Sequence, residues 1–294
     1  MNYKLITDSC VDLPNDLAIK LELDVIPLKV TIKGKEYANY LDNREINPVM
    51  FYDLLREENT ATTAQLNPND FIEKFTPILT AGEDVLYLSF SSALSGTYSS
   101  SLIAQKELKE SFPDRKIIII DTLAASMGQG LLVTLAAKER LNGKTIDEVA
   151  EFVDDIKLKI CHLFTVSDLG HLRRGGRLSA SSLFLGNLLS IKPLLHVNLK
   201  GELKVYGKAR GRFKSLNNLV SRMEESFDKD NNDIVYISHG DCLEDAIYVR
   251  NIIKDKLNLK DEQFLINHIG PVIGAHSGVN TLAIFYVGNE RDMK

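Results

Sequence analysis

A hydroxyl-rich segment between residues 89 and 97 has the composition of an anion-binding turn. It reads Ser89-Phe90-Ser91-Ser92-Ala93-Leu94-Ser95-Gly96-Thr97 and follows a compact apolar run from Val85 to Ser89. A helix is predicted to start at its end, and the unpaired backbone N–H groups of a helix start favour negative charge. The turn supplies more hydroxyls than one helix cap needs, so we interpret it as a ligand site. Helix capping alone is the competing interpretation.

Two more polar turns follow predicted strands. Thr7-Asp8-Ser9-Cys10 comes after the opening strand, and Asp121-Thr122 leads to Ser126-Met127-Gly128. In open α/β sheets, ligands bind beyond the carboxyl ends of the strands, where polar turns converge. The three turns are therefore candidates for one ligand site.

An arginine-rich segment from Gly170 to Leu178 places Arg173, Arg174 and Arg177 around a Gly-Gly pair. This pattern predicts a flexible turn that presents guanidinium groups to a carboxylate or a phosphate. The alternative is a solvated basic loop without a ligand. A sugar-phosphate or nucleotide-binding regulator, with its phosphate on this turn, is one function that the segment leaves open.

A glycine-punctuated segment from Gly270 to Gly278 contains His276 and Ser277 and is predicted to be a loop between strands. His276 is a candidate site residue, and a buried structural histidine is the alternative. A serine hydrolase or transferase would use Ser91 or Ser92 as nucleophile and His276 as base. The Gly-x-Ser-x-Gly elbow is missing, and no acid is placed to orient the histidine.

Cofactor and metal motifs are missing from the sequence. There is no Gly-x-Gly-x-x-Gly after the first strand and no Gly-x-x-x-x-Gly-Lys-Ser/Thr. The six histidines include no pair at helical ligand spacing, and the carboxylates form no calcium-loop pattern. We therefore expect no metal and no cofactor.

Short apolar runs alternate with helix-like segments, which is typical of an α/β fold with parallel strands covered on both faces. In the first half the predicted strands are Lys4 to Ile6, Val85 to Ser89 and Ile117 to Ile120. Helix starts are predicted by Asn47-Pro48, by Asn67-Pro68, and by capping-box spacing in Thr145 with Glu148 and Asp241 with Glu244.

The second half is also predicted to be α/β. Apolar residues at intervals of three and four, beginning at Phe213 and at Leu243, predict two amphipathic helices. Strands are predicted over 234–237, 264–269 and 282–287, and a hairpin at Lys200-Gly201. We predict two lobes, residues 1–163 with a three-layer α/β/α sheet and residues 164–294, with the ligand between them.

The composition restricts the class of protein. The 294 residues include 35 Lys and Arg against 40 Asp and Glu, a net charge of −5, and the basic residues are interspersed with acids, which argues against nucleic-acid binding. No secretory signal and no membrane-spanning stretch is apparent, so a cytoplasmic protein is expected. Cys10, Cys161 and Cys242 are interpreted as reduced packing residues.

Taken in order, these motifs resemble the DegV proteins, which include the fatty-acid-binding subunit (FakB) of bacterial fatty acid kinase. The resemblance covers essentially the whole chain. Its segments are Thr7-Asp8-Ser9, Asp12-Leu13-Pro14, Thr63 and Gln65 before Pro68, Ser91-Ser92, Leu94 to Tyr98, Asp121, Leu172, Gly175-Gly176-Arg177, Lys192-Pro193, Lys208-Ala209-Arg210, and Ile273 to Gly278.

The resemblance implies a two-lobe α/β carrier that holds one long-chain fatty acid and is not an enzyme by itself. The carboxylate would meet the hydroxyls of Thr63, Ser91 and Ser92, with Arg177 and His276 completing the network. A separate ATP-binding kinase subunit (FakA-like) would phosphorylate the bound carboxylate.

Two further points come from the resemblance. Arg210 matches a position that, in the family, faces the kinase subunit and not the acyl tail. This chain departs from the family pattern at Ala64, Leu66, Val279 and Asn280, and these departures bear on the shape of the head-group pocket.

Overall fold

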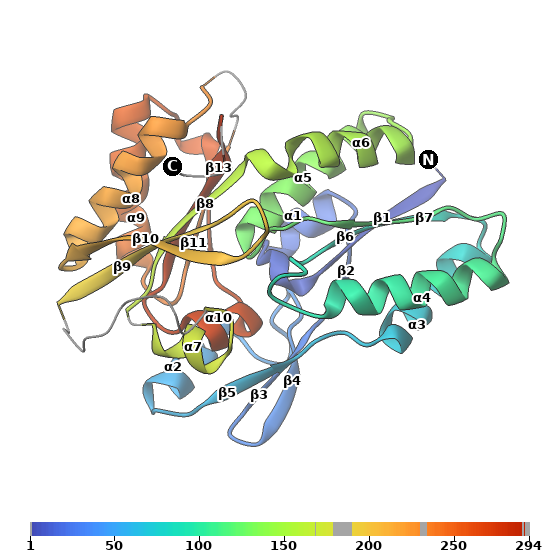
Figure 1. The fold of residues 1–294 in the computed structure, drawn as a ribbon, viewed down its shortest axis with the longest axis horizontal. Coiled ribbons are helices and arrows are strands. Elements are labelled where there is room, and N and C mark those ends of the chain that lie inside the picture. The colour runs from blue at the N-terminus through green and yellow to red at the C-terminus, as the bar shows by residue number, and fades with distance from the viewer. Residues whose placement is uncertain (1, 168, 179–189, 230–233, 290, 292–294) are drawn as a thin grey trace.

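The apolar runs of the first half form a four-stranded parallel sheet in the order β2-β1-β6-β7 (Figure 1). The computed structural model describes residues 2–167, 169–178, 190–229, 234–289 and 291. The strands are β1 (Tyr3–Asp8), β2 (Asp24–Ile26), β6 (Asp84–Ser89) and β7 (Ile117–Asp121). The helices are α3 (Pro68–Thr80), α4 (Thr97–Ser111), α5 (Met127–Leu141) and α6 (Ile146–Ile156). Val85 and Tyr87 pack with α3 and α4, whereas Leu86 and Leu88 pack with α5 and α6, so both faces are covered.

A mixed six-stranded sheet dominates the second half, in the order β10-β9-β8-β13-β11-β12. Its strands are β8 (Ile160–Thr165), β9 (Ile191–Val197), β10 (Leu203–Arg210), β11 (Val235–His239), β12 (Phe264–His268) and β13 (Leu282–Val287). Helices α8 (Arg212–Ser226) and α9 (Leu243–Leu257) cover one face. The hairpin expected at Lys200-Gly201 is confirmed as the antiparallel pair β9–β10. The expected boundary at 163/164 falls inside β8, and the division into two domains stays a prediction.

Helix α5 lies between the two sheets and contacts both (Figure 1). It is buried on nearly all sides, as expected for a helix with core on every face. Small residues allow this close packing. A Cβ on Gly128 would lie 2.1 Å from His162 Nε2, and one on Gly130 would lie 2.6 Å from the carbonyl oxygen of Val11. The first lobe is therefore packed directly against the second.

A small antiparallel sheet, in the order β4-β3-β5, was not expected from the sequence. Its strands are β3 (Lys29–Ile32), β4 (Lys35–Ala38) and β5 (Ala61–Ala64), and they are short because polar turns interrupt the apolar pattern every few residues. The remaining elements are α1 (Asn15–Lys20), α2 (Pro48–Arg56), α7 (Gly170–Arg174), α10 (Pro271–Ser277), and the 3₁₀ turns Ser9–Val11, Lys157–Lys159 and Asp261–Gln263.

Three of the four predicted helix starts are confirmed. Asn47 and Asn67 cap α2 and α3 ahead of a proline, and Thr145 forms a capping box with Glu148. The prediction for Asp241 is wrong. Its side chain pairs with Arg56 at 2.5 Å instead, and Cys242 becomes the residue before the helix, without a side-chain cap.

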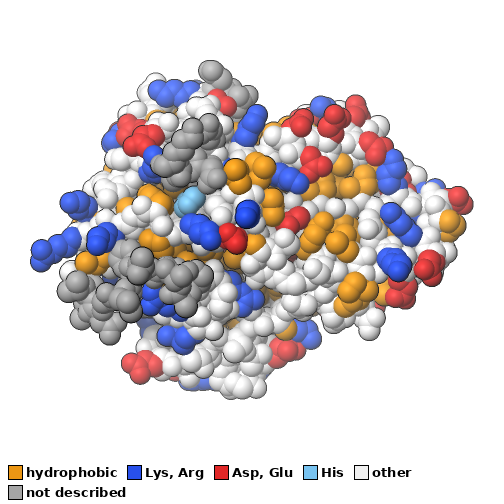
Figure 2. Space-filling model, viewed as in Figure 1, with side chains coloured by type: hydrophobic (Ala, Val, Ile, Leu, Met, Phe, Trp, Pro, Cys, Tyr) orange, Lys and Arg blue, Asp and Glu red, His pale blue; other side chains and the backbone are white. Residues whose placement is uncertain are grey.

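Some helical faces and loops also differ from expectation. Phe213 and Leu243 lie at the first turns of α8 and α9 and are 63% and 50% exposed, although the periodicity predicted them on the buried faces. The segment from Gly270 to Gly278 is mostly the helix α10, and the arginine-rich segment begins with the helix α7. Figure 2 shows basic and acidic side chains interspersed over the face in view.

Candidate functional site

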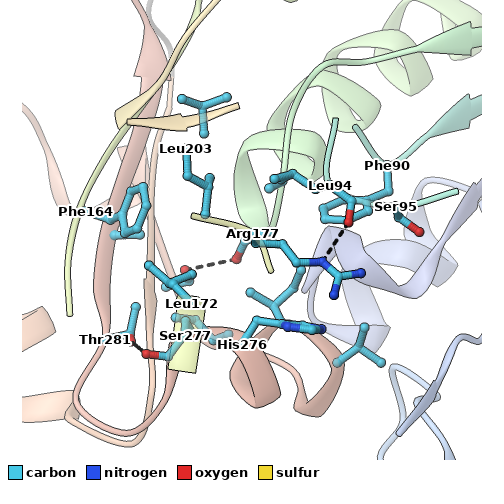
Figure 3. Close-up of a pocket in the computed structure, with 18 of the residues that line it drawn as sticks. Phe90, Leu94, Ser95, Phe164, Leu172, Arg177, Leu203, His276, Ser277 and Thr281 are labelled. Carbon is cyan, nitrogen blue, oxygen red and sulfur yellow. Dashed lines mark hydrogen bonds between the residues drawn. The ribbon is translucent and has the colours of Figure 1, made fainter. Parts of the chain in front are cut away.

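An apolar pocket opens between the two main sheets, beside α7 and α10 (Figure 3). It encloses about 820 Å³ of space free of protein atoms, including the part open to solvent. The volume inside it that is open to the centre of a water-sized molecule is about 100 Å³. Phe90 and Leu94 come from the first half of the chain, and Phe164, Leu172, Leu203 and Phe285 come from the second. Both halves of the chain therefore build the pocket.

Thr63 and His276 form a hydrogen-bonded pair on the pocket wall. Thr63 Oγ1 lies 2.8 Å from His276 Nε2, which joins β5 to α10. The other ring nitrogen, Nδ1, is buried without a hydrogen-bond partner and faces Gly175, where a Cβ would lie only 2.2 Å from it. A buried N–H without an acceptor is costly, so the arrangement favours the tautomer with its proton on Nε2. Thr63 Oγ1 then accepts a hydrogen bond from the Nε2–H group. The Thr63 hydroxyl proton stays available for a hydrogen bond to a ligand.

The His276 ring is neutral near pH 7. Burial is the main cause of a pKa lowered to about 4, and the nearby charges of Arg177 and His171 lower it further. The positive charge at this end of the pocket therefore belongs to Arg177. A protonated His276 is therefore not the group that would neutralise an anion here.

Arg177 is held by two backbone carbonyls. Its Nε donates to the carbonyl oxygen of Leu94 at 2.9 Å, and its Nη1 donates to that of Gly175. Burial lowers the pKa of the Arg177 guanidinium, but arginine stays charged in proteins. No carboxylate of the described residues lies within ion-pair distance of it. The guanidinium can therefore compensate the charge of a ligand carboxylate.

Ser91 and Ser92 do not line this pocket, whereas Thr63, Arg177 and His276 do. Ser91 is buried, and its Oγ donates to the carbonyl oxygen of Gly201 at 3.0 Å. Ser92 is exposed, and its backbone N–H donates to the Asp121 carboxylate at 3.1 Å. The proposed nucleophile Ser91 and base His276 are thus engaged with other partners. Ser95 is the serine of the hydroxyl-rich turn that reaches the pocket.

Arg210 lies away from the pocket. It is exposed at the end of β10, where it pairs in register with Ile191. Arg173 and Arg174 are also exposed, on α7. Of the three arginines in the 170–178 segment, only Arg177 turns inward, because its backbone follows the left-handed Gly176.

The comparison with known proteins agrees with this geometry. A family model described as uncharacterised protein, DegV family, matches residues 2–289. The chain belongs to the DegV family. A DegV domain-containing protein of Clostridium perfringens is 45% identical to it over 290 residues, 99% of each chain.

Solved DegV structures share the fold along the whole chain. A DegV family protein from Thermus thermophilus, described as fatty acid binding, is 30% identical with a TM-score of 0.86 and covers 98% of this chain and 100% of its own. The fatty acid binding DegV family protein from Streptococcus agalactiae is also 30% identical, with a TM-score of 0.83 over 97% and 98% of the two chains. These likenesses confirm the mixed α/β fold expected from the DegV resemblance.

Two aspartates shape the DegV site without touching the pocket, and their roles were not deduced from the sequence. Asp8 is fully buried, and its carboxylate accepts from the Cys10 N–H at 3.1 Å, the Tyr87 hydroxyl at 2.9 Å and the Phe90 N–H at 2.9 Å. Burial raises the pKa of Asp8, and these hydrogen bonds oppose that rise. Asp8 therefore holds the turn that carries Phe90 into the pocket.

Asp12 joins segments from the two halves of the chain. Its carboxylate accepts from Ser126 Oγ at 2.6 Å and from the Gly270 N–H at 2.9 Å, and its carbonyl accepts from Asn267 at 2.8 Å. Burial is the main cause of a pKa raised to about 7. In the sequence, both aspartates were visible only as members of the polar segments at the end of the first strand that carry the DegV resemblance.

The described residues hold no group of three or more His, Cys, Asp or Glu side chains that could bind a metal. No helix within the described ranges combines the length and apolar character needed to cross a bilayer.

Proposed function

We propose that this protein binds one long-chain fatty acid, with its acyl tail in the interlobe pocket and its carboxylate at Thr63, His276 and Arg177. The observation that carries the proposal is an apolar pocket whose wall holds a neutral Thr–His pair and a guanidinium that has no carboxylate partner among the described residues. The Thr63 hydroxyl would donate to the carboxylate, and Arg177 would compensate its charge. Fatty acid binding by the related proteins of Thermus thermophilus and Streptococcus agalactiae supports this choice of ligand.

The acyl tail would supply most of the affinity. Burying about 15 methylenes at ~0.8 kcal/mol each contributes roughly 12 kcal/mol before the cost of ordering the chain. The head group then sets the direction of the ligand. Phe90, Leu94 and Leu203 offer the apolar surface that such a chain requires.

Ser91 and Ser92 stay predicted members of the head-group site. The Ser91 hydroxyl would have to leave the Gly201 carbonyl to reach the carboxylate. A change of the Ser91 rotamer on entry of the ligand would free the hydroxyl from that carbonyl.

We further propose that the protein is a carrier without catalysis of its own, and that a separate ATP-binding fatty acid kinase subunit phosphorylates the bound carboxylate. The exposed Arg210 would contact that subunit. Hydrogen bonds from hydroxyls and one guanidinium leave a carboxylate oxygen free for phosphoryl transfer. The resulting acyl phosphate would serve phospholipid synthesis in the cytoplasm.

Mass spectrometry of an organic extract of the purified protein tests the proposal. We expect about one fatty acid per chain, or loading to that ratio after addition of octadecanoic acid. A protein that carries none and cannot be loaded would contradict it. Incubation of the loaded protein with a fatty acid kinase subunit and ATP then tests the carrier role, with acyl phosphate as the expected product.

A further inference from the structure

Besides Ser95 and the proposed head-group residues, three serines line the pocket: Ser126, Ser238 and Ser277. We call them the serine step. Ser277 Oγ is buried, with 7% of the residue exposed, and it has no hydrogen-bond partner within the described part of the chain. A buried hydroxyl without a partner is unfavourable, so a pocket wall that keeps one is suited to a polar group of a ligand.

The other two serines have a defined hydrogen-bond direction. When Asp12 is ionised, above about pH 7, Ser126 donates its single proton to the Asp12 carboxylate at 2.6 Å. Ser126 and Ser238 are 3.2 Å apart, so in that state Ser238 is the donor of the pair. The hydroxyl proton of Ser238 is then used in the bond to Ser126, so Ser238 can only accept a hydrogen bond from a ligand. Ser277 can both donate and accept one.

Backbone contacts bring the two sides of the step together. Thr281 Oγ1 donates to the Ser277 carbonyl at 2.9 Å, and the Thr281 carbonyl accepts from the Gly240 N–H at 2.7 Å. Gly240 follows Ser238 by two residues, and Ser238 pairs in register with Ala283, which also lines the pocket. Figure 3 shows Ser277 and Thr281 on the side of the pocket opposite Leu94 and Ser95.

The charge behind the step selects against an anion. The Asp12 carboxyl lies directly behind Ser126, so a ligand carboxylate at the step would face a like charge above about pH 7, where Asp12 is ionised. A neutral hydroxyl group on a ligand has no such penalty. It can donate a hydrogen bond to Ser238 and accept one from Ser277, so it suits both sides of the serine step.

We propose that the serine step binds a hydroxyl group on the acyl chain, so that the ligands include monohydroxylated long-chain fatty acids. This inference rests on the proposed fatty acid binding and adds a second polar contact along the chain. A hydroxyl at any other carbon would be buried against apolar side chains without a partner.

A panel of octadecanoic acids, each with one hydroxyl at a different carbon, tests the inference against unsubstituted octadecanoic acid. We expect one hydroxyl position to bind about three- to tenfold more tightly than octadecanoic acid, and distant positions to bind about tenfold or more weakly. Ser238→Ala and Ser277→Ala should each remove most of that preference. Ser277→Ala loses no internal hydrogen bond, so the variant is expected to fold normally.

Ser215→Ala is the matched control, since Ser215 is a buried serine on α8 outside the pocket. It should leave the preference for one hydroxyl position unchanged. The protein could bind octadecanoic acid and bind every hydroxylated acid of the panel equally more weakly. That result would overturn the serine step and leave the proposed function intact. Failure to bind any acid of the panel would overturn the proposed function and the serine step together.

Discussion

The Asp12 carboxylate accepts a hydrogen bond from the backbone N–H of Gly270 at 2.9 Å, across the contact between the two lobes. Gly270 is the residue before α10, the helix that carries His276. The same carboxylate accepts from Ser126 at the start of α5. One side chain after the first strand therefore aligns the helix of the head-group site with the helix between the sheets.

Asp12→Ala should destabilise the fold by about 2–4 kcal/mol. It leaves the Gly270 N–H and the Ser126 hydroxyl without their acceptor, and each buried polar group without a partner costs about 1–3 kcal/mol. Asp12→Asn keeps an oxygen for Gly270 and should cost less. Urea unfolding of the two variants at pH 7 measures the difference, and equal loss in both would contradict a role for the acceptor oxygen.

The raised pKa of Asp12 predicts a pH dependence of stability. The folded state holds this proton up to about pH 7, whereas the unfolded chain releases it near 3.8. Ionisation of Asp12 therefore removes stability as the pH rises from about 4 to about 7, by up to about 4 kcal/mol. Asp12→Asn should remove this dependence, seen as a flatter unfolding free energy between those pH values. Asp16→Asn, a change at an exposed carboxylate of the neighbouring helix, should not.

His276 contributes in the opposite direction. Its pKa is about 4 in the folded protein and 6.5 in the unfolded chain, so the unfolded chain gains a proton first as the pH falls. Stability from the neutral ring is fully present above pH 6.5 and is lost as the pH falls toward 4. Proton uptake on unfolding at pH 5, followed by calorimetry in two buffers, should be smaller by nearly one proton in His276→Gln. An unchanged uptake would show that the ring titrates normally.

Thr63→Val should weaken fatty acid binding by about tenfold or more while the fold is kept. Valine preserves the shape of threonine but lacks the hydroxyl that would donate to the carboxylate, a charge-assisted hydrogen bond of about 1.5–3 kcal/mol. Displacement of a fluorescent fatty acid measures the affinity. Thr63→Ser should restore most of it, and Thr62→Val is the control at the adjacent exposed position. Equal affinities in all three variants would exclude Thr63 from the head-group site.

Gly175→Ala should disturb the site through His276. The added Cβ would lie 2.2 Å from Nδ1, so the ring must move and its hydrogen bond to Thr63 must break or lengthen. We expect weaker fatty acid binding, by several-fold. The control is Gly207→Ala, where the added Cβ comes no closer than 3.4 Å to another side chain. Tight binding in both variants would show that the ring position is unimportant.

Arg210→Ala should leave fatty acid affinity nearly unchanged and slow formation of acyl phosphate with the kinase subunit. Its side chain is exposed and lies outside the pocket. Lys204→Ala, on the same strand and also exposed, is the control. If Arg210→Ala lost fatty acid binding as well, the residue would belong to the ligand site instead of the contact with the kinase.

Local patterns in the sequence determined the main elements of the fold. The apolar runs of β1, β6 and β7 were visible because strands covered on both faces require continuous apolar residues. Asn47, Asn67 and Thr145 were visible as caps because capping depends on residues only three apart. The DegV pattern placed Thr63, Arg177 and His276 among the candidate site residues in the same way, by their order along the chain.

Only the tertiary structure decided which of these residues meet. Thr63 and His276 are 213 residues apart, and their contact depends on packing of α10 against the small sheet that no periodicity predicted. The direction of each serine is also a tertiary property, because Ser91 turns to the Gly201 carbonyl of a distant hairpin while Ser277 faces the pocket. Spacing along a chain sets local conformation, whereas the partner of a buried polar group depends on which distant segment packs beside it.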